Sequence, residues 1–238
     1  MESWELILLF ASALFGGLSV FLFKNDNANK LKLVLSFSGA YLFAITVLHL
    51  MPDVYSSGNP QIGLFILGGF LLQILMEQFS EGIEHGHIHK HHHEHSVFPL
   101  GIMISLCLHA FLEGMPLAKG EHRELVYGIA LHHIPAAFAL GSVLLQNNSS
   151  KNKIILLMSV FALMSPLGYV LSFFIGKGSI GGNITAYFDN IMGVVIGIFL
   201  HISTTILFES SVDHKFNLKK FIAVLLGVSI ALIGYFLH

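Results

Sequence analysis

Residues 153–176 read KIILLMSVFALMSPLGYVLSFFIG, and only the first side chain of this stretch, Lys153, is charged. About 20 mostly apolar residues are enough for an α-helix to cross the hydrocarbon core of a membrane. The strands of a membrane barrel are shorter and alternate apolar with polar residues, which is not the pattern of this stretch. The stretch therefore predicts a transmembrane helix.

Seven further stretches have the same character, and polar or Gly/Pro-rich segments separate them. We interpret the first stretch as a span rather than a signal peptide, because Glu2 and Glu5 stand where a signal peptide carries positive charge. The sequence thus predicts an all-α, polytopic membrane protein with eight transmembrane helices in a single domain over residues 1–238. The predicted spans are 4–23, 31–52, 61–79, 97–118, 124–146, 153–176, 184–208 and 217–237.

The composition also indicates a membrane protein. Of the 238 residues, 54% are hydrophobic and 11% are charged, and the mean hydropathy is +0.75. Because soluble domains carry about 25% charged residues, a secreted or cytosolic domain is excluded. The net charge of −2 offers no basic surface for nucleic acid, and the single Cys107 excludes a disulfide framework or a thiolate metal cluster. The unusual feature is 15 histidines against 12 lysines and arginines together.

The basic residues predict the orientation of the chain, since cytoplasmic loops are enriched in Lys and Arg. One side carries only Lys119, Arg123 and Lys177. We therefore expect both termini to be extracytoplasmic and a His-rich loop at about 80–96 to be cytoplasmic, in a cytoplasmic (inner or plasma) membrane. The basic residues of the other side, in the loops after the odd-numbered spans, are Lys24, Lys30, Lys32, Lys90, Lys151, Lys153, Lys215, Lys219 and Lys220.

The loop between the third and fourth spans contains EHGHIHKHHHEH at residues 84–95. Such a tract is typical of metal binding, because neutral imidazole suits zinc, nickel, copper and iron. We interpret it as a metal buffer or sensor, with a loop of incidental affinity as the alternative. Its candidate ligands are His85, His87, His89, His91, His92, His93 and His95.

The fourth span holds an imidazole and a carboxylate four residues apart, His109 and Glu113. This spacing places both on one face of a helix, where they can chelate one cation. An ionisable group inside the membrane is costly and so indicates function, although a His–Glu hydrogen bond between helices is the alternative. Pro116 removes a backbone donor, and we expect it to leave the carbonyl of Leu112 free and to widen this polar strip.

The fifth span carries His132 and His133 near its middle, followed by Pro135. Adjacent residues point about 100° apart on a helix, so the two histidines need not share an ion. If the fourth and fifth spans are antiparallel, their midpoints meet and His109, Glu113 and His132 lie at one depth. Three nitrogen and oxygen ligands with room for water suit a transient metal site.

Two more histidines lie in spans, His49 in the second and His201 in the seventh. Each is either a ligand on a metal pathway or a hydrogen-bond donor between helices. Glu77, Asp189 and Glu209 lie near span ends, and we place them at the membrane interface.

Five segments together resemble the ZIP (Zrt/Irt-like) family of divalent-metal transporters. HAFLEG at 109–114 and HHIPAA at 132–137 are similar to the patterns of its fourth and fifth spans, and SPLG at 165–168 to its sixth. HLMPD at 49–53 and FLHISTTILFE at 199–209 are similar to the ends of its second and seventh spans. The resemblance covers most of the chain.

The sequence departs from the family pattern where members with two metals place ligands of the second one. Ala110, Ala136 and Ser165 stand at those positions, so three ligands are missing. The resemblance therefore implies one mononuclear site built by the fourth and fifth helices.

The resemblance further implies that the protein is not an enzyme and uses no catalytic cofactor. The implied substrate is a divalent metal ion, with Zn²⁺ favoured over Fe²⁺ or Mn²⁺, moved into the cytosol by alternating exposure of a midplane site. The lipid bilayer is its other partner, and a homodimer is a candidate assembly. Since imidazole must be neutral to bind metal, we expect transport to weaken at acid pH.

Two other functions remain open from the residues. A membrane metal-binding sensor would use the same ligands. His89, His92 and His93 fit the H-x-x-H-H spacing of membrane di-iron hydroxylases. Such enzymes need several separated cytosolic clusters, however, and this sequence has one.

Overall fold

The computed structural model describes residues 2–22, 28–80, 82, 99–119, 123–176, 188–209 and 217–237. All regular structure in these residues is helical, which confirms the predicted all-α class. In chain order the elements are α1 (Ser3–Leu18), η1 (Ser19–Phe21), α2 (Ala28–Ile45), η3 (Thr46–Leu50), α3 (Met51–Ser56), α4 (Ile62–Ser80), α5 (Leu100–Gly114), η5 (Met115–Lys119), α6 (Arg123–Gln146), α7 (Lys151–Gly176), α8 (Phe188–Glu209) and α9 (Leu218–Leu237).

Across the described residues, eight helical segments are long and apolar enough to cross a membrane, as the sequence predicts. The second span is longer than predicted, because it runs from Leu31 to Ser56 straight through Pro52. Proline lacks an N–H to donate within a helix. Ahead of Pro52 the helix widens into a π-helical turn, η3, which carries His49.

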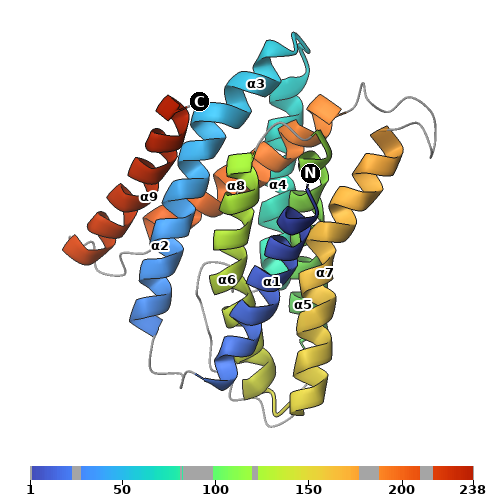
Figure 1. Cartoon of the computed structure of the whole chain (residues 1–238), viewed down its shortest axis with the longest axis vertical. Helices are drawn as coiled ribbons and strands as arrows, with labels where there is room; N and C mark the ends of the chain where they lie inside the picture. The colour runs from blue at the N-terminus through green and yellow to red at the C-terminus, as the bar shows by residue number, and fades with distance from the viewer. Residues whose placement is uncertain are drawn as a thin grey trace.

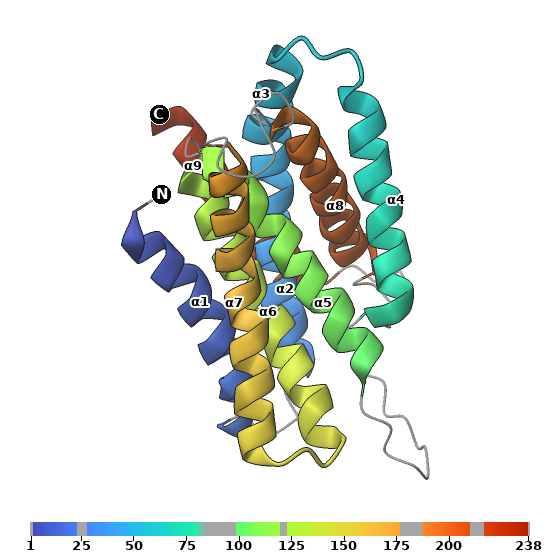
Figure 2. The same ribbon diagram turned by 90° about the vertical axis from the view of Figure 1, so that its right-hand side faces the viewer.

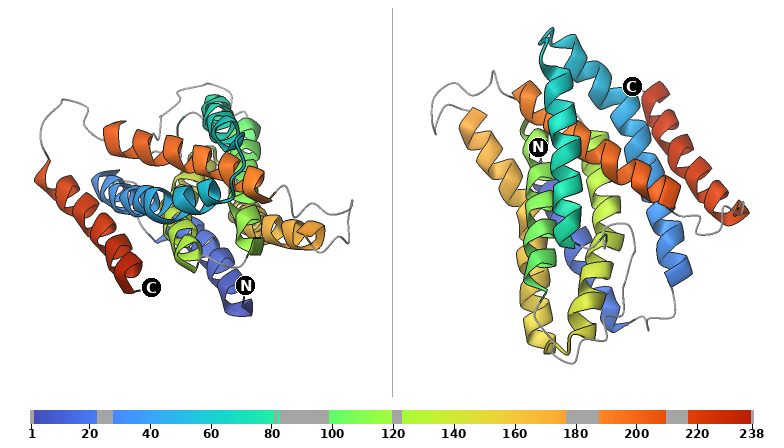
Figure 3. Two further views of the ribbon diagram at one scale, coloured as in Figure 1. Left: turned by 90° about the horizontal axis from the view of Figure 1, so that it is seen from above. Right: turned by 180° about the vertical axis from the view of Figure 1, so that it is seen from behind.

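Most of the helices run roughly along the long axis of the molecule, whereas α8 crosses it obliquely, and the two ends of the chain lie toward the same end of the bundle (Figure 1). We call this the terminal end. The opposite end, where α4 finishes and α5 begins, is called the loop end. Helix α6 runs through the middle of the bundle and is largely buried, whereas α9 lies at the edge beside α2 (Figure 3).

The remaining helices pack around α6 in two groups. Helices α1, α5 and α7 lie on one side, with α7 in contact with both of the others (Figure 2). Helices α2, α4, α8 and α9 lie on the other side, where α4 packs along α8 and α9 packs along α2. Contacts of α2 with α6 and of α4 with α5 join the two groups.

Glycines allow the closest helix pairs to approach backbone to backbone. Gly69 of α4 faces the backbone of Val194 in α8, and Gly197 of α8 faces the carbonyl of Ile66 in α4. A methyl group at either glycine would collide with that backbone. Small residues at helix interfaces are typical of membrane bundles, where close van der Waals packing holds helices together.

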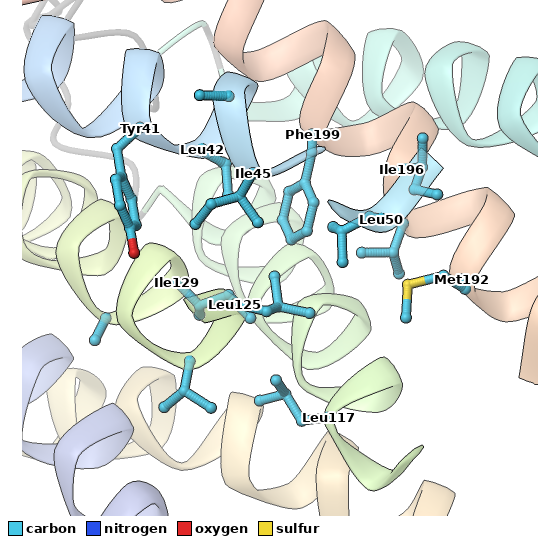
Figure 4. Close-up of a cluster of buried hydrophobic side chains, with 14 of the residues drawn as sticks. Tyr41, Leu42, Ile45, Leu50, Leu117, Leu125, Ile129, Met192, Ile196 and Phe199 are labelled. Atoms are coloured by element: carbon cyan, nitrogen blue, oxygen red, sulfur yellow. The ribbon is translucent and has the colours of Figure 1, made fainter. Parts of the chain in front are cut away.

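An apolar cluster fixes the start of α6 against α2 and α8 (Figure 4). Because η5 also contributes to it, the cluster holds η5, at the end of α5, close to the start of α6. The antiparallel pairing of these two helices follows. Its labelled members are Tyr41, Leu42, Ile45, Leu50, Leu117, Leu125, Ile129, Met192, Ile196 and Phe199.

One face of α4 is apolar and exposed along its whole length. Leu64, Leu67, Leu71, Leu75 and Phe79 recur at helical spacing on this face, and each is more than half exposed. Such a stripe would aggregate in water but suits contact with lipid chains. The surface thus agrees with a multi-pass membrane protein.

Candidate metal site

The candidate site lies between α5 and α6, halfway along the bundle. Helix α5 presents His109 and Glu113, and α6 presents His132 and His133. All four side chains are buried. Because α5 and α6 run antiparallel, the imidazole and carboxylate groups of the two helices come together.

Three of these residues converge on one point. His109 Nε2 lies 3.1 Å from Glu113 Oε1, and the imidazole rings of His109 and His132 are 5.8 Å apart between centroids. One ligand atom from each of His109, Glu113 and His132 lies within 4.8 Å of the other two. Ligands of one Zn²⁺ sit about 2.0–2.2 Å from the ion, so a small inward movement would let all three coordinate it.

His133 occupies a different position from its neighbour. Its Nε2 lies 2.8 Å from Glu113 Oε2, whereas the contact of His109 is with Oε1 of the same carboxylate. The ring packs against Phe161 of α7, with a centroid distance of 5.8 Å. The carboxylate of Glu113 is therefore held between histidines from two helices.

Small side chains surround this group. Ala110, Ala136 and Ser165 are all buried, and the hydroxyl of Ser165 has no hydrogen-bond partner within the described part of the chain. Gly114 lies against the carbonyl of Ser165, which brings α7 close to α5.

The expectation for Pro116 was wrong. The carbonyl of Leu112 accepts a hydrogen bond from the N–H of Met115 and is not left free. The chain tightens into the 3₁₀ turn η5 at this point, and 3₁₀ bonds reach back three residues rather than four. The turn thereby replaces the donor that the proline removes.

The sequence profile of ZIP zinc transporters matches residues 84–234 of the chain. The chain belongs to the ZIP zinc transporter family. Zinc transporter ZIP1 of Danio rerio is 30% identical over 162 residues, which cover 63% of this chain and 51% of that protein. Zinc transporter 1 of Oryza sativa subsp. japonica is 30% identical over 146 residues, which cover 54% of this chain and 40% of that protein.

Protein zntD of Dictyostelium discoideum is 28% identical over 167 residues, covering 63% of this chain and 24% of that protein. The chain thus spans about half or less of the length of these ZIP relatives. Zinc transport is the activity that the family name carries, and it agrees with a buried cluster of imidazole and carboxylate ligands.

The ZIP chain has a second, partly buried His–carboxylate contact, nearer the loop end. His201 Nε2 of α8 lies 2.6 Å from Glu77 Oε2 of α4, and Phe70 packs edge-on against the imidazole. Sequence reasoning placed Glu77 at the membrane interface. The signal that it missed is the spacing of Phe70, Gln73 and Glu77, which puts the three on the face of α4 that packs against α8.

His49 lies apart from His109, Glu113 and His132, which we call the central group. Its ring packs edge-on against Tyr235 of α9, with centroids 5.3 Å apart. Its Nε2 is buried and has no hydrogen-bond partner within the described ranges. The structure therefore separates His49 and His201 from the group of His109, Glu113 and His132.

A charged cluster lies at the terminal end. Lys119 Nζ lies 3.1 Å from Asp53 Oδ2 and 3.9 Å from Asp189 Oδ1, and all three side chains are about one-third exposed. They line a pocket of about 590 Å³ between α3, η5, α7 and α8. Asp189, which we placed near a span end, thus lines this pocket.

Some predicted site residues lie outside the described ranges. These are the seven histidines of the loop, His85, His87, His89, His91, His92, His93 and His95. Their role as a metal-binding tract stays a prediction.

Proposed function

We propose that this chain carries a divalent metal ion, with Zn²⁺ as the favoured substrate, across a membrane and into the cytosol. The observation that supports this is the group of His109, Glu113 and His132, buried halfway along two helices that are apolar enough to span a membrane. Ionisable groups at such a depth are costly, and in membrane proteins they mark ion and proton pathways.

The ligand set suits a transported ion rather than a permanently bound one. Two imidazoles and one carboxylate match the ligands that Zn²⁺ takes in proteins, and three protein ligands leave a coordination position for water. An ion must be held well enough to replace its hydration shell but weakly enough to leave. Fe²⁺ and Mn²⁺ are the competing substrates, because imidazole and carboxylate also bind them.

The rest of the proposed path follows the axis of the bundle. The pocket of Asp53 and Asp189 would receive the ion at the terminal end, and His201 with Glu77 would accept it on the way to the loop end. The distribution of lysines supports a cytoplasmic loop end, where the His-rich tract would meet the emerging ion. The proposed protein is a single transmembrane transporter domain over residues 1–238, in a cytoplasmic or plasma membrane.

The proposal makes the chain a transporter rather than an enzyme. The relatives in zebrafish and rice are named zinc transporters, which supports this choice over the hydroxylase that the loop histidines suggested. A metal-binding sensor stays the alternative function, because it would need the same buried ligands. A measurement of ion movement across a membrane distinguishes the transporter from the sensor.

Flux through reconstituted protein tests the proposal. Wild type in liposomes should admit Zn²⁺, and the double variant His109→Ala/Glu113→Ala should not. Deletion of residues 84–95 should leave Zn²⁺ flux in place, because the central ligands remain. Binding of Zn²⁺ without any flux of Zn²⁺, Fe²⁺ or Mn²⁺ would instead favour the sensor.

A further inference from the structure

The two carboxylate oxygens of Glu113 have different partners. Oε1 lies 3.1 Å from Nε2 of His109, one of the residues of the converging ligand group. Oε2 lies 2.8 Å from His133 Nε2. His133 is not part of the group whose ligand atoms converge, although it lies next to His132 in sequence.

The direction of the His133–Glu113 hydrogen bond determines what His133 can do. An ionised carboxylate has no proton to give, so His133 Nε2 must carry the hydrogen and donate it. A nitrogen that carries this hydrogen has no lone pair for a metal ion. The other nitrogen, Nδ1, is buried and finds no hydrogen-bond partner among the described residues. His133 in this arrangement serves Glu113 rather than an ion.

Packing holds the His133 ring in the orientation that makes this bond. The side chain is 2% exposed, and the ring lies against Phe161, which is itself buried in the contact between α6 and α7. A buried ring with an aromatic neighbour has little freedom to rotate away. The hydrogen bond to Oε2 is therefore in place before an ion arrives.

We propose that His133 is a positioning residue that sets which ion the site prefers, by holding Glu113 Oε2 so that only Oε1 can coordinate. This inference rests on the proposed function only in taking the central group as the ion site. With Oε1 and two imidazoles the protein supplies three ligands, which with one water gives the four-coordinate arrangement typical of Zn²⁺. Mn²⁺ prefers six, mostly oxygen, ligands and gains less from such a set.

Release of Oε2 would change that balance. Without a donor at position 133, both oxygens of Glu113 could turn toward the ion and coordinate it together. The site would then offer one more oxygen and a looser carboxylate. Zn²⁺ would lose a preorganised ligand, whereas Mn²⁺ would gain an oxygen.

A matched pair of variants tests the proposal in the full chain. In His133→Gln the amide nitrogen reaches about as far as Nε2 and can still donate to Oε2. In His133→Leu a side chain of similar size offers no donor. Two measurements give the preference for Zn²⁺ over Mn²⁺. The first is equilibrium binding of each ion to purified protein, repeated with residues 84–95 deleted to remove binding by the loop histidines. The second is the KM of each ion for uptake into liposomes.

We expect wild type and His133→Gln to have the same ratio of Zn²⁺ affinity to Mn²⁺ affinity. In His133→Leu this ratio should fall by about tenfold, which is the lower end of the effects seen for residues that orient metal ligands. X-ray absorption at the zinc edge, on the three proteins with residues 84–95 also deleted so that the loop histidines do not contribute, should find two imidazole ligands in each. An unchanged Zn²⁺ preference in His133→Leu would overturn the proposal, as would three imidazoles in wild type and two in both variants.

Two further measurements keep the outcome decisive. If His133→Leu aggregates, His133→Asn replaces it, because the shorter amide does not reach Oε2. The same tenfold fall in the preference for Zn²⁺ over Mn²⁺ is expected for this variant. If wild type binds Zn²⁺ but moves none, the proposed transport fails. The binding preference of the variants still decides the role of His133 in that case.

Discussion

The chain pairs a histidine with a glutamate in two places, and the burial of the two pairs differs. At the centre, Glu113 is fully buried and lies between His109 and His133, with His132 nearby. Near the loop end, Glu77 is 22% exposed and contacts His201. The central carboxylate is thus buried among several imidazoles, while the other is partly exposed and contacts one imidazole.

The difference shows how burial changes what the same two residue types can do. Charges interact far more strongly in a dry interior than beside water. The central group is therefore suited to hold an ion, and the Glu77–His201 pair to pass one on. The predictions below follow this ranking from the largest effect to the smallest.

The largest effect should come from Glu113→Gln, which removes the carboxylate of the central group. We expect Zn²⁺ uptake to fall by more than about 100-fold, because residues that merely support a metal ligand already cost 10–100-fold. The measurement is the initial rate of Zn²⁺ uptake into liposomes, with Glu77→Gln as the matched control. If Glu113→Gln and Glu77→Gln reduce Zn²⁺ uptake equally, the difference in burial between the two glutamates does not determine their contribution to transport.

A smaller effect should follow from Glu77→Gln or His201→Gln. We expect about a tenfold loss of uptake rate, since the pair is partly exposed and, in the proposed path, acts only on passage of the ion. Equilibrium binding of Zn²⁺ at the central group should be unchanged in either variant. A loss of Zn²⁺ affinity as large as the loss of rate would contradict a role in passage.

Sequence alone predicted the parts of the molecule that depend on local pattern. The length of apolar stretches predicted eight spans, because crossing a membrane sets a minimum length of helix. The four-residue spacing of His109 and Glu113 predicted a shared helical face, and antiparallel neighbours then brought His132 to the same depth. The proximity of these three residues could therefore be predicted from the sequence.

What depends on contacts between distant helices was not predicted. The bond from His133 to Glu113 requires the rotation of α6 about its axis, which neighbouring helices set. The pairing of Glu77 with His201 requires the register of α4 along α8, and glycine contacts fix that register. The 3₁₀ turn after Glu113 was missed because a helix can compensate for a proline in more than one way.

Two adjacent glycines of α4 allow a test of the register of α4 along α8, which brings Glu77 to His201. Gly69 faces the backbone of Val194, whereas a methyl group at Gly68 would meet nothing within 4 Å. Gly69→Ala should destabilise the protein by about 1–3 kcal/mol through overpacking. Gly68→Ala should be neutral or stabilising by up to about 1 kcal/mol, because alanine favours helix more than glycine does.

Thermal unfolding in detergent measures both glycine variants. Uptake of Zn²⁺ by Gly69→Ala should fall to the level of Glu77→Gln, because a shift of α4 along α8 separates Glu77 from His201. Unaltered uptake together with lower stability would show that the pair tolerates the shift. Equal melting temperatures for the two variants would contradict the close approach of α4 and α8.

The smallest effect should come from Lys119→Gln at the terminal end. Lys119 lies between Asp53 and Asp189, and the three side chains are about one-third exposed, so water screens these ion pairs. Exposed pairs contribute about 0–1 kcal/mol, and we expect stability to change by no more than that.

Uptake should respond to Lys119→Gln in the opposite sense to the central variants. Removal of the lysine leaves two carboxylates at the pocket, which would attract a divalent cation more strongly and lower the KM for Zn²⁺ a few-fold, while Vmax stays the same. Since charges about 8 Å apart are already screened at about 0.15 M salt, the effect should vanish as salt rises. A salt-independent loss of Vmax would instead mean that Lys119 acts on the central site through η5. The exposure of Lys119 would then not predict the small size of its effect on uptake.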